Sequence, residues 1–353
     1  MRAAGGRLAC DAVLDGPPSG RAGNHDVANH DVTRGHLADN LVFGMTGDAS
    51  VAILANRSSG LTARTAEAVD VAVSMLAGHG FYPRLFMARR GGLEEALAAC
   101  RAHEPDLVFV IGGDGTILAA AEAFLGTDTR LAIVPLGTVN QLARDLDIPL
   151  DPALAVASFV GGSIRAIDVG MVNGRAFLCT SVVGPLAKLQ RYREQARGRL
   201  PATLLAIVTT ILKAFRLRPM RLVLGDGART WREDSRGVIV SVNPFLRQPS
   251  RIPRRASLDG GRLAIYAARD NGRLTLMKMA AAILAGRAED NANIVYHEAP
   301  AIRIGARRRR ITVLNDGEIR LLPMPLQFKL MPGALRVLAP GQSVAAPAAV
   351  VAP

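Results

Sequence analysis

Two glycine-rich turns, each directly after an apolar run, are the segments of this sequence best suited to bind phosphate. The first, "GGDGT", comprises Gly112, Gly113, Asp114, Gly115 and Thr116, and the second, "PLGTVN", contains Gly137, Thr138 and Asn140. Glycines can adopt backbone angles closed to other residues and let backbone N–H groups approach a ligand closely. A threonine that opens a helix places the helix N-terminus there, which favours a phosphate. We therefore expect both turns to contact the phosphates of a nucleotide.

Two polar side chains in these turns have more specific expected roles. Asp114 can face a bound metal ion or the reacting phosphate, and Asn140 can brace its turn or cap the following helix. Each turn alone could equally be an ordinary strand-to-helix connection, where Gly, Asp and Thr are common. Neither turn matches the Walker A loop or the G-x-G-x-x-G fingerprint. Two such turns on neighbouring strands favour the ligand-binding interpretation.

The elements that must position these turns alternate between about residues 49 and 150. Apolar runs predict strands at 51–56, 82–88, 106–111 and 131–135, and helical spacing predicts helices at 61–78, 93–102, 116–125 and 139–146. Alternating strands and helices predict a parallel, doubly wound α/β sheet. Ligands of such sheets bind beyond the carboxyl ends of the strands, which is where both glycine turns fall.

After about residue 163 the pattern changes to short strand-like runs separated by turn residues. These runs predict a second, mostly antiparallel domain, a β-sandwich, with helical segments at 185–217 and 274–286. The expected boundaries are a flexible tail at 1–48, the α/β nucleotide-binding domain at 49–163, the β-sandwich domain at 164–330, a closing strand at 331–340 and a flexible tail at 341–353.

Composition limits the possible partners. The formal net charge of +13 attracts anions such as nucleotides, nucleic acid or an acidic membrane surface, although the arginines could simply be solvated. Aromatic residues make up 4% of the chain, which speaks against nucleic-acid binding through stacked bases. The three cysteines, Cys10, Cys100 and Cys179, are far apart, so we expect no disulfide framework and no zinc site, as suits a cytoplasmic protein. The apolar stretch 200–212 is shorter than the roughly 20 residues that cross a bilayer.

Taken together, "GGDGT" and P-x-G-T-x-N-x-x-A-R resemble the diacylglycerol-kinase-type lipid kinases, a family that includes sphingosine and ceramide kinases and is distantly related to NAD kinases. "ANRSSG" (55–60), "DVGMVNGRAFL" (168–178), "NDGE" (315–318) and the segment 325–340 are similar to further family motifs. The resemblance covers nearly all of residues 50–340. It implies an α/β nucleotide domain, a β-sandwich lipid-substrate domain, an active site between them, and ATP and Mg²⁺ as cofactors.

The resemblance also implies roles for individual residues. The expected catalytic residues are Asp114, which would face the metal and ATP, and Glu318 or Asp316 as the base, with Glu318 preferred. The expected nucleotide contacts are Asn56, Ser58, Ser59, Gly60, Gly112, Gly113, Gly115, Thr116, Gly137, Thr138 and Asn140. On its residues alone, "NDGE" predicts no more than a tight hairpin turn, because Asn-Asp-Gly is a strong turn signal. Asp168 could orient active-site groups or cap a strand at the surface.

The chain departs from the family pattern at several positions. Leu118 and Cys179 stand where the family often has Asn, and Ala88 stands where a nucleotide-contacting Thr is common. Some relatives bind a structural magnesium ion near an Asp-Asp-Gly segment. Here Gly260 replaces the second acid after Asp259, which argues against that metal. These differences could mean altered substrate preference, weakened activity or no activity.

Two basic segments could contact a membrane. Residues 188–221 contain nine Lys or Arg against Glu194, with an apolar helical face, and could either lie on an anionic bilayer or pack on the protein's own domain. The "RRRR" run at 307–310 is expected to be a solvated hairpin tip. We predict a cytoplasmic, ATP-dependent lipid kinase that phosphorylates diacylglycerol or a related lipid alcohol and that could contact the inner membrane face peripherally. The alternatives are an NAD kinase and a catalytically silent nucleotide- or lipid-binding protein.

Overall fold

The computed structural model describes residues 49–56, 62–184, 187, 219–250, 252–269 and 274–341. The predicted tails at 1–48 and 342–353 and most of the predicted helical segment 185–217 lie outside these residues. Ser58, Ser59 and Gly60 also lie outside the described residues.

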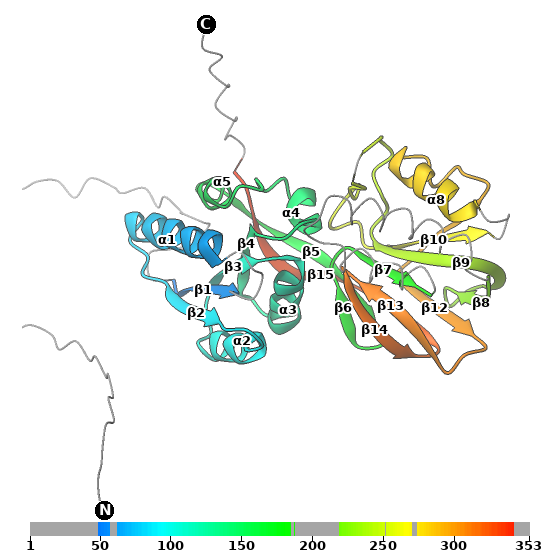
Figure 1. Ribbon diagram of the computed structural model, residues 1–353, viewed down its shortest axis with the longest axis horizontal. Coiled ribbons are helices and arrows are strands. Elements are labelled where there is room, and N and C mark those ends of the chain that lie inside the picture. Colours follow the sequence, from blue (N-terminus) through cyan, green and yellow to red (C-terminus); the bar gives the residue numbers. More distant parts are fainter. Residues whose placement is uncertain are drawn as a thin grey trace, which may run out of the picture. The chain divides into compact units, whose positions relative to one another are not determined.

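The first half of the described chain forms the predicted doubly wound α/β layer. Its elements are β1 Val51–Asn56, α1 Thr62–Gly78, β2 Arg84–Ala88, α2 Leu93–Ala102, β3 Leu107–Gly112, α3 Asp114–Phe124, β4 Arg130–Pro135, α4 Gln141–Asp145 and α5 Pro152–Ser158. The four strands are parallel in the order β2-β1-β3-β4. Helix α1 packs against α5 and α2 packs against α3, and each pair covers one face of the sheet (Figure 1).

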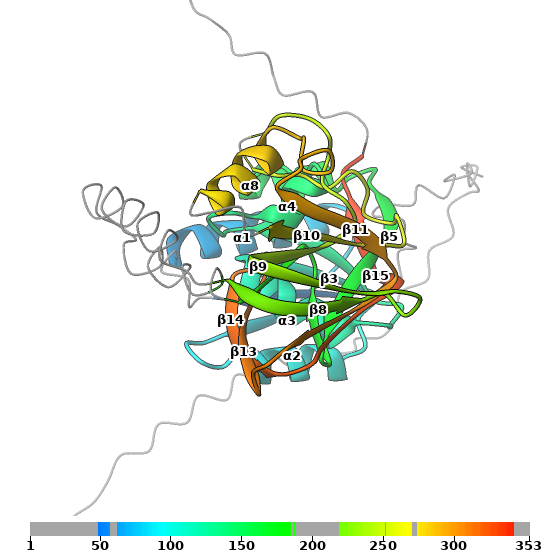
Figure 2. The same cartoon turned by 90° about the vertical axis from the view of Figure 1, so that its right-hand side faces the viewer.

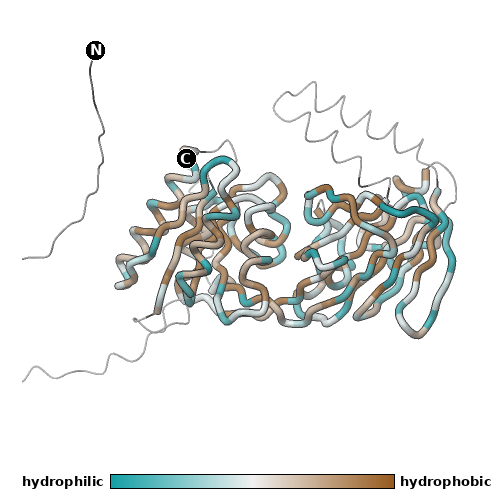
Figure 3. Tube along the Cα trace, turned by 90° about the horizontal axis from the view of Figure 1, so that it is seen from below, coloured by the Kyte–Doolittle hydropathy of each residue, from teal (hydrophilic) through white to brown (hydrophobic). Residues whose placement is uncertain are grey.

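The second half is antiparallel, as predicted, and its described residues form the β-sandwich together with helix α8 (Figure 2). Its elements are β5 Ser163–Val172, β6 Arg175–Phe177, β7 Thr180–Val183, β8 Met220–Gly225, β9 Thr230–Val242, β10 Leu263–Arg269, α8 Thr275–Leu284, β11 Ile294–Ala299, β12 Ala301–Ala306, β13 Arg310–Asn315, β14 Glu318–Pro323 and β15 Leu326–Ala339. The edge of Phe177 packs on Phe328 inside it, with ring centroids 6.0 Å apart. Apolar stretches follow the inner strands, whereas the hairpin turns are hydrophilic (Figure 3).

Strand β15 joins the two halves into one hydrogen-bonded sheet. Its first part pairs with β12, its last part runs parallel to β4, and β5 pairs antiparallel along most of its length. The register shifts between Met331 and Leu335, where the strand passes from one half to the other. The sequence predicted two separate segments here, because the bulge interrupts the alternation of apolar and polar residues.

Three further features differ from the sequence-based expectation. Helix α5 was not predicted, although Asp151 caps it by accepting hydrogen bonds from the N–H groups of Ala153 and Leu154. Strand β11 was not predicted either. The run 175–182, predicted as one strand, is divided between β6 and β7 by Leu178 and Cys179.

Candidate functional site

The two glycine turns meet at one edge of the parallel sheet. Strands β3 and β4 are neighbours with Gly112 opposite Pro135, so the turns that follow them emerge side by side. The Asp114 carboxylate accepts hydrogen bonds from the backbone N–H groups of Asn140 and Gln141, both at 3.1 Å. The first turn thus holds the second through Asp114, which caps α4 from outside the helix.

The glycines of these turns are required by close packing rather than by unusual backbone angles. Gly113 has φ −87°, and neither turn contains a glycine with positive φ, so that part of the sequence-based expectation is wrong. A Cβ atom on Gly137 would lie 2.6 Å from Asn140 Oδ1 and 3.1 Å from the Gly113 Cα atom. A Cβ on Gly112 would lie 2.7 Å from the Cβ of Thr116. The two turns can lie against each other because Gly113 and Gly137 have no side chain, and the absence of a side chain at Gly112 leaves room for Thr116.

Polar side chains fix the rest of this surface. Asn140 has φ 51°, and its side chain accepts a hydrogen bond from the Gly137 N–H and donates one to the Gly137 carbonyl. It therefore braces the turn and does not cap α4. Asn56, at the end of β1, donates to the Thr116 hydroxyl at 2.9 Å. Thr138 is exposed beside these groups. The predicted contacts Ser58, Ser59 and Gly60 lie outside the described residues.

The "NDGE" segment forms the predicted hairpin turn between β13 and β14, with Asp316 at φ 45° and Gly317 at φ 98°. The Asp316 carboxylate is partly buried and accepts hydrogen bonds from the N–H groups of Leu178, Cys179 and Thr180. These bonds explain the break between β6 and β7. Burial raises the pKa of Asp316 above its usual value, although the three N–H groups oppose that rise.

Glu318, in contrast, reaches across to the first glycine turn. Its Oε1 atom lies 3.3 Å from the position that a Cβ on Gly115 would occupy. Its Oε2 atom accepts a hydrogen bond from Arg320 at 2.7 Å, and its side chain is 40% exposed. A carboxylate from the sandwich half therefore stands beside the turn that carries Asp114.

A cavity of about 1210 Å³ is lined by most of these groups, including Asp114, Asp316 and Glu318. One part is polar and is lined by Asn56, Asp114, Thr116, Thr138, Glu318 and Arg320. Another part is apolar and is lined by Val182, Ile239, Phe245, Ile283, Leu284 and Leu314. The cavity therefore offers both polar groups for a phosphate donor and an apolar lining for a lipid acceptor.

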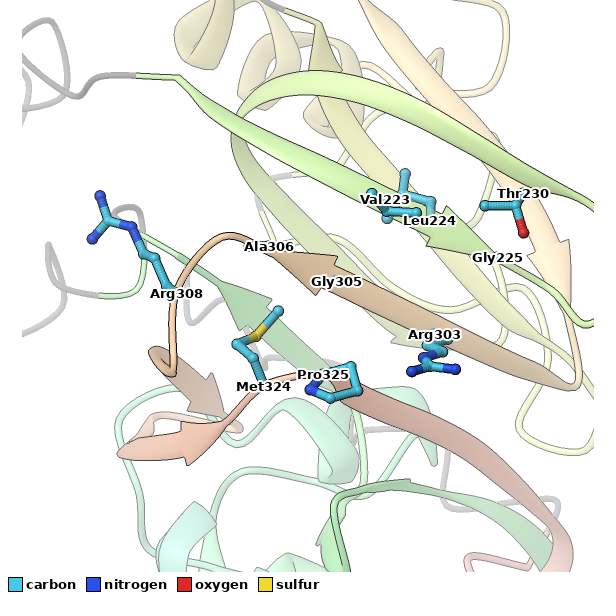
Figure 4. A pocket seen from close by; sticks show the side chains of 10 residues that line it. All are labelled: Val223, Leu224, Gly225, Thr230, Arg303, Gly305, Ala306, Arg308, Met324 and Pro325. Carbon is cyan, nitrogen blue, oxygen red and sulfur yellow. The ribbon is translucent and has the colours of Figure 1, made fainter.

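A second, smaller pocket of about 360 Å³ lies on the sandwich between β8, β12 and the Met324–Pro325 segment (Figure 4). Arg303 and Arg308 are its charged residues, and it contains none of the expected catalytic or nucleotide-contacting residues. The larger cavity is therefore the candidate active site.

Comparisons with known proteins agree with this geometry. The family model of the diacylglycerol kinase catalytic domain matches residues 50–172, and that of the YegS C-terminal NAD kinase beta sandwich-like domain matches residues 184–339. A diacylglycerol kinase of Mycobacterium tuberculosis (strain H37Rv) is 30% identical over 265 residues, which cover 69% of this chain and 80% of that protein. This chain belongs to the diacylglycerol kinase family of lipid kinases.

Two further relatives support the family and the fold. A diacylglycerol kinase of Bacillus subtilis (strain 168) is 25% identical over 235 residues, 65% of this chain and 76% of that protein. The structure of a diacylglycerol kinase from Bacillus anthracis superimposes with a TM-score of 0.59 at 19% identity, covering 82% of this chain and 97% of that one. The predicted lipid kinase class is thereby confirmed, and a kinase of this family takes its phosphate from ATP.

The residues present are compatible with Mg²⁺ held mainly by ATP. Among the described residues, no group of three or more His, Cys, Asp or Glu side chains is placed to hold a metal ion. Magnesium commonly binds through one or two carboxylates together with substrate phosphates, so an all-protein cage is not required. Asp114, which lines the cavity, would supply one such carboxylate.

The lipid kinase contains a buried ion pair that the sequence did not reveal. Arg255 Nε donates to Asp145 Oδ2 at 2.8 Å, and both side chains are 1% exposed. Arg255 also donates to the carbonyl of Leu178, beside the amides that hold Asp316. Nearby, the Gln141 side chain donates to the Pro253 carbonyl at 2.6 Å. No spacing in the sequence links residues 145 and 255, so no signal could have predicted this pair.

Asp168 is a buried connector and not a surface cap. It accepts hydrogen bonds from the Asn243 side chain and from the N–H groups of Gly261 and Gly333.

Cys179, one of the departures from the family pattern, lines the cavity as a buried thiol. Burial raises the pKa of this thiol well above its usual value. Leu118 and Ala88 are buried as well. The Asp259 carboxylate accepts a hydrogen bond from the Ser257 hydroxyl.

None of the helices in the described part of the chain is both long enough and apolar enough to span a bilayer.

Proposed function

We propose that this lipid kinase transfers the γ-phosphate of ATP to the hydroxyl of diacylglycerol, forming phosphatidic acid. The observation that carries the proposal is the position of Glu318 beside the Gly112–Thr116 turn, within a cavity that also has an apolar part. The names of the relatives from Mycobacterium tuberculosis and Bacillus subtilis support diacylglycerol as the acceptor.

In this proposal the two glycine turns receive the phosphates of ATP. Backbone N–H groups at the start of α3 and the hydroxyls of Thr116 and Thr138 would donate hydrogen bonds to phosphate oxygens. Asn56 would hold the Thr116 hydroxyl in place. Asp114 would face the phosphates while fixing the distance between the turns. Bound Mg²⁺ would neutralise charge on the phosphates.

Glu318 is the proposed base. As the lipid oxygen forms its bond to the γ-phosphorus, the bond from that phosphorus to the bridging oxygen of ADP breaks, and Glu318 accepts the hydroxyl proton. The three N–H groups already bound to Asp316 leave its carboxylate poorly placed for this task. We therefore assign Asp316 the role of fixing the turn that presents Glu318.

A transfer assay with the purified full chain tests the proposal. Labelled ATP and Mg²⁺ would be supplied with diacylglycerol, sphingosine, ceramide or NAD, each alone. Label in phosphatidic acid is the expected result. Label in NADP, or ATP binding without transfer to any acceptor, would replace the proposal with an NAD kinase or a silent binding protein.

The variant Asp114→Asn provides a test within the site, and Asp70→Asn, an exposed carboxylate on α1, is the matched control. We expect transfer to fall by about 10²-fold or more in Asp114→Asn, in the range found for removal of one oriented charged group. The control should retain the wild-type rate. Equal rates in the two variants would remove Asp114 from the mechanism.

A further inference from the structure

Helix α8, Thr275–Leu284, has an unusual surface for a helix on the outside of a protein. Its sequence, TLMKMAAAIL, contains a single charged residue, Lys278. An exposed helix face normally carries charged and polar residues, and a helix that is apolar all round is normally buried. Half of α8 is nevertheless exposed, and the preceding Leu274 is 51% exposed, Met277 43% and Leu284 41%.

The two sides of α8 are clearly separated. The buried side, which includes Leu276, Met279 and Ile283, packs into an apolar cluster with Tyr266 on β10. Residues spaced by three or four positions share a helix face. Met277, Ala281 and Leu284 therefore form an outward apolar strip, and Leu274 extends it by one turn.

The outward strip is continuous with the cavity of the kinase site. Ala280, Ile283 and Leu284 of α8 line that cavity along one flank of the helix. Leu284 belongs to both the cavity lining and the outward strip, so apolar surface extends from the cavity around the helix to its exposed side. Lys278 lies on the other flank. Within the described helix α8, Lys278 is the one charged side chain, and this flank therefore offers an acyl chain an apolar path along the helix.

We propose that the outward face of α8, formed by Leu274, Met277, Ala281 and Leu284, docks on an anionic lipid bilayer and admits the lipid substrate to the cavity. The proposal rests on the lipid kinase function. An apolar helix face lying in the bilayer interface would bury these side chains, and Lys278 would meet the anionic headgroups. The net charge of +13 strengthens attraction to such a surface.

Flotation with lipid vesicles tests the docking surface. The full chain would be mixed with phosphatidylcholine vesicles that contain or lack phosphatidylserine, an anionic lipid without a free hydroxyl, so that no phosphate acceptor is present. The test variant is the double substitution Leu274→Glu and Met277→Glu, neither of which lines the cavity. The matched control is Leu85→Glu with Leu154→Glu, because these leucines are 45% and 50% exposed on β2 and α5.

We expect wild type and control to bind the anionic vesicles equally. The α8 variant should bind them about tenfold more weakly or worse. Two apolar side chains that the bilayer would bury are lost, and two negative charges that the anionic lipids repel are added. Its transfer rate on a short-chain, water-soluble acceptor should equal that of wild type, and its KM for acceptor in vesicles should rise. This pattern differs from that of a merely misfolded variant.

Three results would overturn the proposal. The first is that the wild-type protein does not float with anionic vesicles, and the second is that the α8 variant floats as well as wild type. The third is that wild type is a dimer, the variant is a monomer, and neither protein binds vesicles. The last result would assign the face to a second copy of this chain. Because the vesicles contain no acceptor, failure of the proposed kinase reaction would leave the flotation result standing.

Discussion

Asp316 and Glu318 are two residues apart, yet their carboxylates have opposite environments. Asp316 adopts φ 45° at the turn, which directs its carboxylate inward to three backbone N–H groups. Glu318 is the first residue of β14 and points into the cavity toward Gly115. One short turn therefore supplies both a structural acceptor and a carboxylate whose Oε1 atom faces the first glycine turn.

Substitution of each carboxylate by its amide should separate these roles. Asp316→Asn replaces an acceptor oxygen with an NH₂ group that faces backbone N–H donors, so we expect the free energy of unfolding to fall by about 2–4 kcal/mol. Glu318→Gln should leave the free energy of unfolding nearly unchanged and lower turnover by about 10²–10⁴-fold, as for loss of a general base. Urea unfolding measures the free energy of unfolding of each variant, and the transfer assay measures its turnover. A Glu318→Gln variant with wild-type turnover would exclude Glu318 as the base.

A buried thiol gives a pH-dependent prediction. Burial raises the pKa of Cys100 from 9.0 to about 12. Between these values the folded protein keeps a proton that the unfolded chain releases, so the thiol's contribution to stability is present below pH 9 and is lost as the pH rises. Between pH 8 and pH 10, wild type should lose about 1 kcal/mol more unfolding free energy than Cys100→Ala. Parallel urea titrations of the two proteins test this, and equal losses would contradict it.

At the scale of elements, helix α4 connects the second glycine turn to the sandwich half. Asp145 at its end pairs with Arg255, which also binds the Leu178 carbonyl next to the Asp316 turn. Arg255 therefore contacts both the element that follows the glycine turn and the segment that holds the base-bearing hairpin. We infer that it positions these two parts of the site.

Removal of one partner of this pair should be costly. Arg255→Ala leaves Asp145 buried without its partner, and we expect a loss of about 3–5 kcal/mol in unfolding free energy. The double variant Arg255→Met with Asp145→Leu should recover much of that loss, because two apolar groups replace two buried charges. If the pair positions the site, the recovered double variant should still have reduced kcat with little change in the KM for ATP. Wild-type kcat in that variant would assign the pair a purely structural role.

The sequence predicted the elements that have strong local signals and missed those that depend on distant partners. The apolar strands β1, β3 and β4 and their helices were predicted because burial on both faces leaves continuous apolar runs. Helix α5 was missed although Asp151 and Pro152 form a recognisable helix start. The break at Leu178 could not be predicted, because its cause is a carboxylate 138 residues away.

The residues of the candidate site likewise divide into those with a local sequence signal and those that depend on distant partners. Asp114, Asn140 and Glu318 were predicted as members of one site and do lie around one cavity or its turns. The expected reason for the glycines was wrong, because close packing between two turns is a tertiary property that local sequence patterns do not contain. Arg320, which hydrogen-bonds Glu318, was missed because strand position alone does not show which side chains share a face with a catalytic group.

At the scale of the whole described chain, β15 makes the two halves interdependent. Leu326, Phe328 and Leu330 belong to the apolar core of the sandwich. Leu335, Val337 and Leu338, on the same strand, belong to the core of the α/β half. A strand shared by two cores cannot leave one of them without disturbing the other, so we expect both halves to unfold together.

Leu335→Ala tests this interdependence from the α/β side. Leu335 is 1% exposed, so its truncation should lower the free energy of unfolding by about 2–5 kcal/mol. Trp231, the single tryptophan of the chain, lies in the sandwich against His297 and reports on that half by its fluorescence. If unfolding is one cooperative transition, the fluorescence midpoint in urea should shift as far as the midpoint from circular dichroism. A fluorescence midpoint that stays at the wild-type value while the circular dichroism midpoint falls would show that the halves unfold separately, despite the strand they share.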